Sequence, residues 1–210
     1  ISMKKKIIIT GGLGYIGTEL CKLYSGVSWH HKITVIDSRF ISERVNQIRN
    51  WNMEFIQGDI LDKNLIKRYC EDADVVHHLA GVTDVPRTKS ESSKAQDEKI
   101  KEVGERGTQN ILDVIKNDCK IIFPSTHVVY EGIDKVKTNI QENEATKPVL
   151  SYSSSKAVNE DQLKKSGKNY VILRLGSVYG YSTDSMRIDI MPNLFSKISS
   201  QNGTLKLFAG

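Results

Sequence analysis

The chain has 210 residues, of which 39% are hydrophobic and 26% charged, so we expect an ordinary globular protein rather than a disordered one. Its apolar runs fall short of the ~20 residues of a membrane span, which argues against a membrane protein. The net charge of +5 comes from scattered basic residues without interleaved aromatics, so we expect no nucleic-acid partner.

The first predicted element is a buried strand, Lys6–Thr10, which leads into the sequence TGGLGYIG and then into a helix over residues 15–24. Glycine loses more backbone entropy on folding than other residues. So many glycines between a strand and a helix therefore indicate that something must come very close to the backbone there.

The spacing of these glycines is typical of a dinucleotide-binding loop. Gly11 allows a tight turn, Gly14 lets a pyrophosphate approach the backbone, and Gly17 lets the helix pack on the strand. The first residues of the helix, Tyr15 and Ile16, belong to the same predicted cofactor site. Free N–H groups at this helix start would bind phosphate oxygens.

An acidic residue, Asp37, ends the second predicted strand, Lys32–Asp37, 20 residues after Gly17. A carboxylate there can accept hydrogen bonds from both adenosine ribose hydroxyls and repels a 2′-phosphate, which favours NAD over NADP. Arg39 argues mildly the other way, because it could hold a 2′-phosphate. The alternative is that the glycines simply make a turn and Asp37 caps a backbone group.

Short apolar strands alternate with helices along the rest of the chain, which predicts a Rossmann-type doubly wound parallel sheet in the α/β class. The further strands are expected over residues 53–57, 74–79, 120–124 and 170–175. The further helices are expected over residues 62–71, 94–117 and 151–165, with an irregular or short helical stretch over 43–51. After Val178 the pattern weakens, and we expect only a helix over residues 190–199 and a strand over 204–208.

We assign residues 3–180 to an NAD-binding Rossmann domain and residues 181–210 to the start of a small substrate domain, which we expect to be truncated. The three cysteines, Cys21, Cys70 and Cys119, lie far apart and show no zinc-binding spacing. We therefore expect no metal site and a cytoplasmic location.

A second chemical signal is the sequence SYSSSK, in which Tyr152 and Lys156 are four residues apart on a predicted helix and share one face. To act as a base, a tyrosine needs its pKa lowered from ~10 to near neutral. A lysine ammonium and a cationic nicotinamide nearby could do this. Ser125 and Thr126 come just past the fifth predicted strand, at the edge where doubly wound sheets bind ligands.

At these residues the chain resembles a known family, the extended short-chain dehydrogenase/reductases. The sequences TGGLGYIG, QGDILD, HHLAG, STHVVY, YSSSK and LRLGSVYG occur in this order in that family, and the resemblance covers essentially the whole chain. Its members are NAD-dependent epimerases and dehydratases that act mostly on nucleotide sugars. The resemblance implies a nucleotide-sugar substrate and a homodimer formed through the helices over 94–117 and 151–165.

The resemblance also implies roles for individual residues. Tyr152 would be the base, Lys156 would hold the cofactor ribose and tune Tyr152, and Thr126 would bridge to the substrate. Asp59 and Ile60 would flank the adenine. The residues implied to line the cofactor cleft or approach the nicotinamide are Leu79, Ala80, Gly81, Ser125 and Val178.

The chain departs from the family pattern at three places. Gly104 and Ser177 stand where the family usually has asparagines, and the second of those commonly helps to bind substrate. Where the dehydratases carry Asp-Glu after the catalytic threonine, this chain has His127 and Val128, so the acid/base pair for water elimination is missing. We retain Ser177 with Thr126 as a substrate-site candidate, and add Arg187 for a diphosphate.

These features together favour a nucleotide-sugar epimerase that transiently oxidises a sugar hydroxyl. A keto-sugar reductase or dehydrogenase could use the same three residues and is the first alternative. A non-catalytic dinucleotide-binding protein is the second, although such a protein would not need a base.

Overall fold

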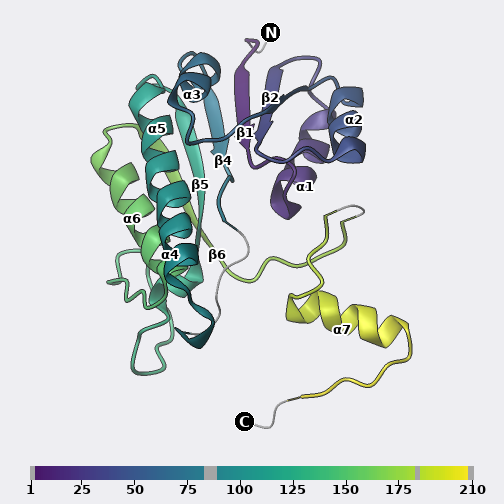
Figure 1. Ribbon diagram of the computed structural model, residues 1–210, viewed down its shortest axis with the longest axis vertical. Helices are drawn as coiled ribbons and strands as arrows, with labels where there is room; N and C mark the ends of the chain where they lie inside the picture. The colour runs from purple at the N-terminus through teal and green to yellow at the C-terminus, as the bar shows by residue number, and fades with distance from the viewer. Residues whose placement is uncertain (1–2, 83–88, 183–184, 208–210) are drawn as a thin grey trace.

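The computed structural model describes residues 3–82, 89–182 and 185–207. Within them the strands form one parallel sheet in the order β3-β2-β1-β4-β5-β6 (Figure 1). The order reverses beside β1, so a crevice opens at the carboxyl ends of β1 and β4, where doubly wound sheets bind ligands. The strands are β1 (Lys6–Thr10), β2 (Lys32–Asp37), β3 (Glu54–Gln57), β4 (Val75–His78), β5 (Lys120–Thr126) and β6 (Asn169–Leu175).

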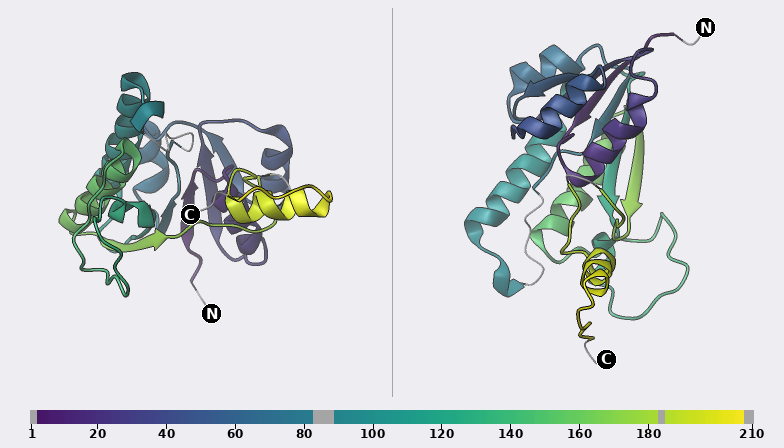
Figure 2. Two further views of the ribbon diagram at one scale, coloured as in Figure 1. Left: turned by 90° about the horizontal axis from the view of Figure 1, so that it is seen from below. Right: turned by 90° about the vertical axis from the view of Figure 1, so that its right-hand side faces the viewer.

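Helices cover both faces of this sheet (Figure 2). One face carries α1 (Tyr15–Ser25) and α2 (Ser42–Asn50). The other carries α3 (Lys63–Cys70), α4 (Lys94–Lys101), α5 (Gly107–Val114) and α6 (Ser151–Lys165). Successive strand residues point to opposite faces. Accordingly, Ile7 and Ile9 belong to the core under α1 and α2, and Ile8 to the core under the other helices. The predicted fold class is confirmed.

The long predicted helix over residues 94–117 is divided by a π turn. This turn, Glu102–Arg106, joins α4 to α5, and the helical run ends at Val114. A π turn leaves backbone carbonyls without their usual helical partners. Two side chains of α6 donate to them, Asn159 to the carbonyl of Gly104 at 3.0 Å and Gln162 to that of Glu105 at 2.8 Å. The division therefore ties α6 to the long helix.

The C-terminal segment departs most from the sequence-based prediction. Helix α7 (Met191–Ser200) lies apart from the helices that cover the sheet (Figure 1). The strand predicted over 204–208 is wrong within the described residues, because 204–207 form no strand and Leu207 is exposed; residue 208 lies outside the described residues. Alternating apolar residues make a strand only where a sheet edge is available for pairing. None of the described helices is long and apolar enough to cross a membrane.

Candidate functional site

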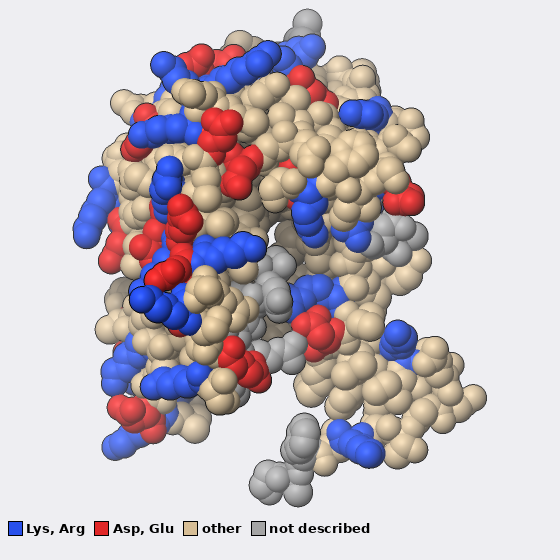
Figure 3. All heavy atoms as spheres, viewed as in Figure 1, with Lys and Arg blue, Asp and Glu red and all other residues tan. Residues whose placement is uncertain are grey.

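A cleft of about 360 Å³ opens at the carboxyl edge of the sheet. In the space-filling view the molecule is hollowed between the helices beside the sheet and the C-terminal segment (Figure 3). The cleft is lined by the glycine loop, the ends of β4 and β5, helix α6 and the segment after β6. The expected site residues among its lining are Gly11, Gly14, Tyr15, Ile16, Gly17, Leu79, Ser125, Thr126, Tyr152, Lys156, Val178 and Arg187.

The glycine loop has the shape that a bound pyrophosphate requires. Gly11 has a φ of +70°, and a Cβ there would lie 2.6 Å from the backbone nitrogen of Ala80. A Cβ on Gly17 would lie 2.5 Å from the carbonyl oxygen of Gly11. Helix α1 begins with Gly14 as its N-cap residue and without a capping side chain. The free N–H groups at this end can therefore bind a phosphate, and the residues present fit a dinucleotide.

Asp37 and Arg39 form one unit at the end of β2. The Asp37 carboxylate is buried and accepts hydrogen bonds from the backbone nitrogens of Leu13 and Arg39, each at 3.0 Å. It also pairs with the Arg39 guanidinium, at 3.2 Å from Nε. Arg39 lines the cleft, whereas Asp37 is not among its lining residues. The carboxylate that we expect to select the ribose therefore anchors the glycine loop and neutralises Arg39.

Besides Asp37, Ala80 and Gly81, three more expected site residues do not line the cleft: Asp59, Ile60 and Ser177. The Asp59 carboxylate accepts a hydrogen bond from the backbone nitrogen of Leu61 at 2.9 Å, and the Ile60 carbonyl accepts one from Asn110 at 3.0 Å. Ser177 is exposed. Their roles at the adenine and the substrate stay predictions.

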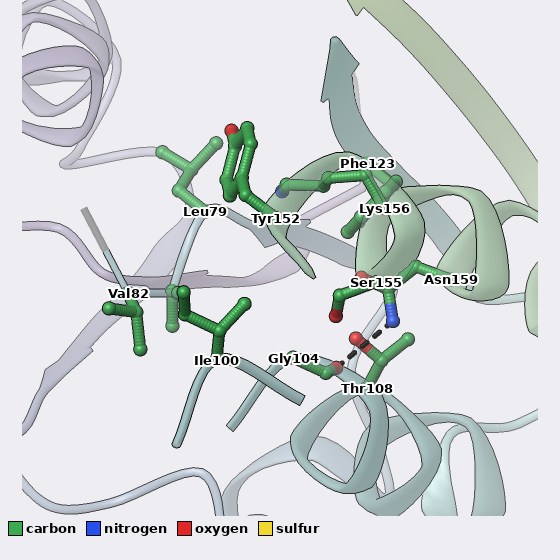
Figure 4. Close-up of a pocket in the computed structure, with 12 residues that line it drawn as sticks. Leu79, Val82, Ile100, Gly104, Thr108, Phe123, Tyr152, Ser155, Lys156 and Asn159 are labelled. Carbon is green, nitrogen blue, oxygen red and sulfur yellow. Dashed lines mark hydrogen bonds between the residues drawn. The ribbon is translucent and has the colours of Figure 1, made fainter. Parts of the chain in front are cut away.

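Tyr152 and Lys156 project from α6 between the cleft and a smaller cavity of about 80 Å³ (Figure 4). Lys156 Nζ lies 5.8 Å from the centre of the Tyr152 ring and 4.5 Å from that of Phe123, and donates to the Pro124 carbonyl at 3.0 Å. Ala80 and Gly81, expected at the cofactor, line the smaller cavity together with Gly104, where the resemblance implies an asparagine.

The electrostatics of this pair, in the absence of cofactor, follow from its burial. Burial lowers the pKa of Lys156 to about 8. Burial also raises the pKa of Tyr152, and the charge of Arg187 opposes this only in part. In this structure Tyr152 is thus a protonated phenol, and the neighbouring lysine alone does not lower its pKa. A further positive charge, such as the nicotinamide of NAD⁺, is needed to make it a base near neutral pH.

The two hydroxyls at the end of β5 have different partners. Ser125 donates to the buried carboxylate of Glu160 at 2.6 Å, so its hydroxyl is engaged with α6. Thr126 lines the cleft, and its Oγ1 accepts a long bond, 3.3 Å, from the backbone nitrogen of Val128. The next side chain, His127, contacts the carbonyl of Leu175 at 3.1 Å. Of these side chains, Thr126 is therefore the one placed to meet a substrate.

Arg187 reaches the cleft from the segment after β6. The guanidinium of Arg187 pairs with Asp189 at 2.6 Å. The backbone carbonyl of Arg187 accepts a hydrogen bond from the Asn193 side chain at 2.8 Å. Asn193 is 3% exposed and also donates to the Tyr15 hydroxyl at 3.2 Å. This amide therefore links α7 and the Arg187 segment to the first turn of α1.

The sequence analysis missed two residues that contact this site, Asn193 and Arg44. Asn193 could have been noticed as a polar residue within the apolar stretch MPNLF, because a buried asparagine usually has a specific partner. Arg44, which lines the cleft and donates to the Leu13 carbonyl, lies in a stretch whose periodicity is weak.

Comparison with known proteins matches residues 7–209 to the NAD dependent epimerase/dehydratase family. The chain is 30% identical over 197 residues to a dTDP-D-glucose 4,6-dehydratase of Dictyostelium discoideum, covering 84% of this chain and 44% of that protein. It is 31% identical over 205 residues to a CDP-paratose 2-epimerase of Salmonella typhi, covering 83% of this chain and 58% of that protein. The chain thus spans about half the length of these relatives.

Solved structures agree on the fold. UDP-glucuronic acid 4-epimerase from Bacillus cereus, in complex with UDP-glucuronic acid and NAD, superimposes with a TM-score of 0.74 at 25% identity, over 97% of this chain and 65% of that one. The enzyme WbmH of Bordetella bronchiseptica, in complex with NAD⁺, gives a TM-score of 0.74 at 24% identity, over 95% and 63% of the two chains. Since the family match extends over nearly all of the sequence, this chain belongs to the NAD-dependent epimerase/dehydratase family.

Proposed function

We propose that this protein is an NAD-dependent nucleotide-sugar epimerase. The observation that carries the proposal is that Tyr152, Lys156 and Thr126 line the same cleft as the glycine loop. A cofactor whose phosphates lie at the start of α1 would have its other end near these three side chains. The relatives of this chain include epimerases named for UDP- and CDP-sugars, which supports a nucleotide sugar as substrate.

In this proposal Thr126 and Tyr152 hold one sugar hydroxyl. Tyr152 takes the hydroxyl proton as the carbon is oxidised. It returns the proton after the keto-sugar has rotated in the cleft to present its other face. When bound, NAD⁺ supplies the reversible acceptor for the electron pair, and its positive ring lowers the pKa of Tyr152. Lys156 holds the cofactor ribose beside Tyr152. Arg187 binds the substrate diphosphate, for which its position in the cleft is suited.

The residues after Thr126 favour epimerisation over dehydration. His127 contacts the Leu175 carbonyl and Val128 has no titratable group, so these positions supply no carboxylate pair to eliminate water. A keto-sugar reductase using the same residues is the second candidate. The two differ in cofactor balance, because an epimerase regenerates NAD⁺ in each turnover and a reductase consumes reduced cofactor.

The test is a screen of UDP-, GDP-, CDP- and dTDP-sugars with the purified protein, with products separated by chromatography and NADH followed by absorbance. An epimer formed without net change in NADH supports the proposal. Stoichiometric consumption of NADH or NADPH identifies the reductase. Cofactor binding without turnover of any of these sugars favours the non-catalytic alternative.

We expect calorimetry to show tighter binding of NAD⁺ than of NADP⁺, because Asp37 neutralises Arg39 and repels a 2′-phosphate. Asp37→Asn keeps an oxygen for the Leu13 nitrogen but leaves the Arg39 charge uncompensated. This variant should gain affinity for NADP⁺ relative to NAD⁺ by about tenfold, the worth of one charge-assisted hydrogen bond. Adding Arg39→Met should remove that gain. Equal binding of the two cofactors by the wild type would contradict the role of Asp37.

Lys156→Met is expected to stabilise the cofactor-free protein while abolishing most of its activity. The pKa of Lys156, about 8, lies below its unfolded value of ~10.4, so the charged form destabilises the fold. The unfolded chain binds more protons between these values, so wild-type stability rises as pH rises through this window. Methionine should therefore add on the order of 1–2 kcal/mol below pH 8 and almost nothing near pH 10.5.

Calorimetric melting of both proteins without NAD, at pH 7 and near pH 10.5, measures this difference. Activity with the best sugar of the screen should fall, because the variant lacks the ammonium that would hold the cofactor ribose beside Tyr152. A variant that is less stable than the wild type at pH 7, or a stability gain that does not depend on pH, would contradict the argument.

We also infer a homodimer through α4, α5 and α6, as the family resemblance implies. The continuous helical run of α4 and α5 and the neighbouring helix α6 give two helices per subunit, and two such pairs can form a four-helix contact. On the side of the molecule shown in Figure 3, Lys and Arg side chains intermingle with Asp and Glu over these helices. Such a mixed surface avoids the repulsion that a face of a single charge would bring to two identical subunits.

A further inference from the structure

Helix α6, which carries Tyr152 and Lys156, begins without a capping group of its own. Its N-cap residue is Leu150, whose side chain makes no capping hydrogen bond, and its first turn contains no acidic residue. The N–H groups at the start of a helix need acceptors, and an unsatisfied first turn frays. Tyr152 is the second residue of this helix, so any fraying would displace it directly.

A carboxylate from another part of the chain binds the N-cap residue and its neighbours instead. Glu131 Oε1 accepts hydrogen bonds from the backbone nitrogen of Val149 at 2.8 Å and from that of Leu150 at 2.7 Å. The Ser153 hydroxyl donates to the same oxygen. A negative charge at this end of a helix is also stabilised by the helix dipole.

Glu131 does not line the cleft, but it directly follows the turn that starts at Thr126. This 3-10 turn, η3 (His127–Tyr130), has Thr126 as its N-cap residue and Glu131 as its C-cap residue. Backbone hydrogen bonds on either side, Lys147 to the Val129 carbonyl and Gly132 to the Lys147 carbonyl, both at 2.8 Å, hold this turn against the segment before α6. One oxygen of Glu131 thus joins the turn behind Thr126 to the helix turn that carries Tyr152.

We propose that Glu131 is a positioning residue that sets Tyr152 relative to Thr126 by capping the catalytic helix. This inference rests on the proposed function, since it assigns Glu131 to the hydroxyl pair that would hold the sugar. A displacement of about 1 Å between reacting groups can cost 10²-fold in rate, so a cap that fixes the first turn of α6 acts on turnover. Glu131 is not among the residues that line the cleft, so cofactor affinity should be independent of it.

Three variants test the proposal, each assayed at saturating NAD⁺ with the best sugar of the screen. Glu131→Ala should lower kcat by about tenfold with NAD⁺ affinity changed less than about twofold. It should also speed amide hydrogen exchange at residues 149–153 by about fivefold, because the Val149 and Leu150 nitrogens and the Ser153 hydroxyl lose their shared acceptor. Glu131→Gln keeps an acceptor oxygen and should retain kcat within about threefold of wild type.

Asp62→Ala is the matched control. The Asp62 carboxylate caps α3 by accepting from the backbone nitrogens of Asn64 and Leu65, at 3.0 and 3.1 Å. Its loss should lower Tm by about 2–4 °C, as the loss of Glu131 should, while kcat stays within about twofold of wild type. Faster exchange in this variant should appear in α3 and not in α6.

Several results would overturn the proposal. They are an unchanged kcat in Glu131→Ala, equal losses of kcat in Glu131→Ala and Asp62→Ala, or a Glu131→Gln variant as impaired as Glu131→Ala. If the wild type turns over none of the sugars, the proposed function fails, and hydrogen exchange alone decides whether Glu131 holds the first turn of α6. Unchanged exchange at residues 149–153 then rejects the cap.

Discussion

Tyr152→Phe is expected to lower turnover of the best nucleotide-sugar substrate by about 10²–10⁴, the worth of a positioned acid–base group, with NAD⁺ affinity little changed. Phenylalanine keeps the ring that packs in the cleft and its contact with the Lys156 ammonium, 5.8 Å from the ring centre. It removes only the hydroxyl that exchanges a proton with the sugar. The loss should therefore fall on kcat more than on binding.

The pH profile gives the same test a second readout. Burial raises the pKa of Tyr152 in the cofactor-free structure, so only the complex with NAD⁺ should contain an ionised tyrosine near neutral pH. We expect wild-type kcat to rise with pH until Tyr152 is ionised in the complex, and the residual activity of the Phe variant to lack this rise.

Tyr179→Phe is a suitable control, because Tyr179 is 67% exposed and does not line the cleft. It should leave both kcat and the pH profile unchanged. If Tyr152→Phe keeps near wild-type turnover on the best sugar, the base lies elsewhere and the proposed mechanism is wrong.

The architecture could be predicted because its determinants are local. The strand KIIIT contains three successive isoleucines, a run typical of a strand buried on both faces, and helical spacing resumes directly after the glycines. The alternation of side chains along a strand likewise places the adjacent residues His77 and His78 on opposite faces of the sheet. His77 contacts the Tyr24 hydroxyl at 2.7 Å on one face, and His78 contacts that of Thr108 at 3.0 Å on the other.

The partners of buried polar groups could not be predicted in this way. The family resemblance implies that Ser125 lies near the nicotinamide, and Ser125 does line the cleft, but its hydroxyl donates to Glu160, 35 residues further along the chain. The capping of α6 by Glu131 likewise joins residues 18 and 19 positions apart. Local periodicity contains no information about such pairs, because each depends on how the finished helices and strands are packed.

The glycine loop illustrates a different limit. The spacing correctly predicts that Asp37 ends β2. The guanidinium of Arg39, only two residues later, donates hydrogen bonds to the Asp37 carboxylate. Whether a side chain faces the ligand or its neighbour depends on rotamers, which spacing does not determine. The position of Asp37 at the end of β2 was therefore predictable, and the partner of its carboxylate was not.

The largest effect on stability is expected from Arg174→Met, at about 3–5 kcal/mol, which corresponds to roughly 10 °C in Tm. The Arg174 guanidinium pairs with Glu160 at 2.6 Å, and the side chains are only 15% and 2% exposed. Arg174 also donates to the Glu142 carbonyl at 3.0 Å. Removing the guanidinium leaves a buried carboxylate without its main counter-charge, and this carboxylate is the one that holds Ser125 beside Thr126.

The pH dependence of this loss follows from Glu160. Burial raises the pKa of Glu160, but hydrogen bonds from Arg174 and Ser125 and the charge of Arg174 outweigh it, so the net pKa lies below its usual value. Ionised Glu160 therefore contributes fully to the stability of the wild type above the unfolded pKa of ~4.3. This contribution is lost as the pH falls through the lower pKa of the folded state. In Arg174→Met, burial should dominate, and Glu160 should become protonated as pH falls towards 4. The Tm difference should thus be largest near pH 7 and shrink by pH 4.

The double variant Arg174→Met, Glu160→Gln separates the ion pair from packing. With both charges gone, no uncompensated carboxylate remains, so the double variant should recover most of the stability that Arg174→Met loses at pH 7. Calorimetric melts of the wild type, both single variants and the double variant at pH 4 and pH 7 complete the cycle. A double variant as unstable as Arg174→Met, with a deficit that does not change with pH, would show that Arg174 acts through packing and its bond to the Glu142 carbonyl rather than through the charge of Glu160.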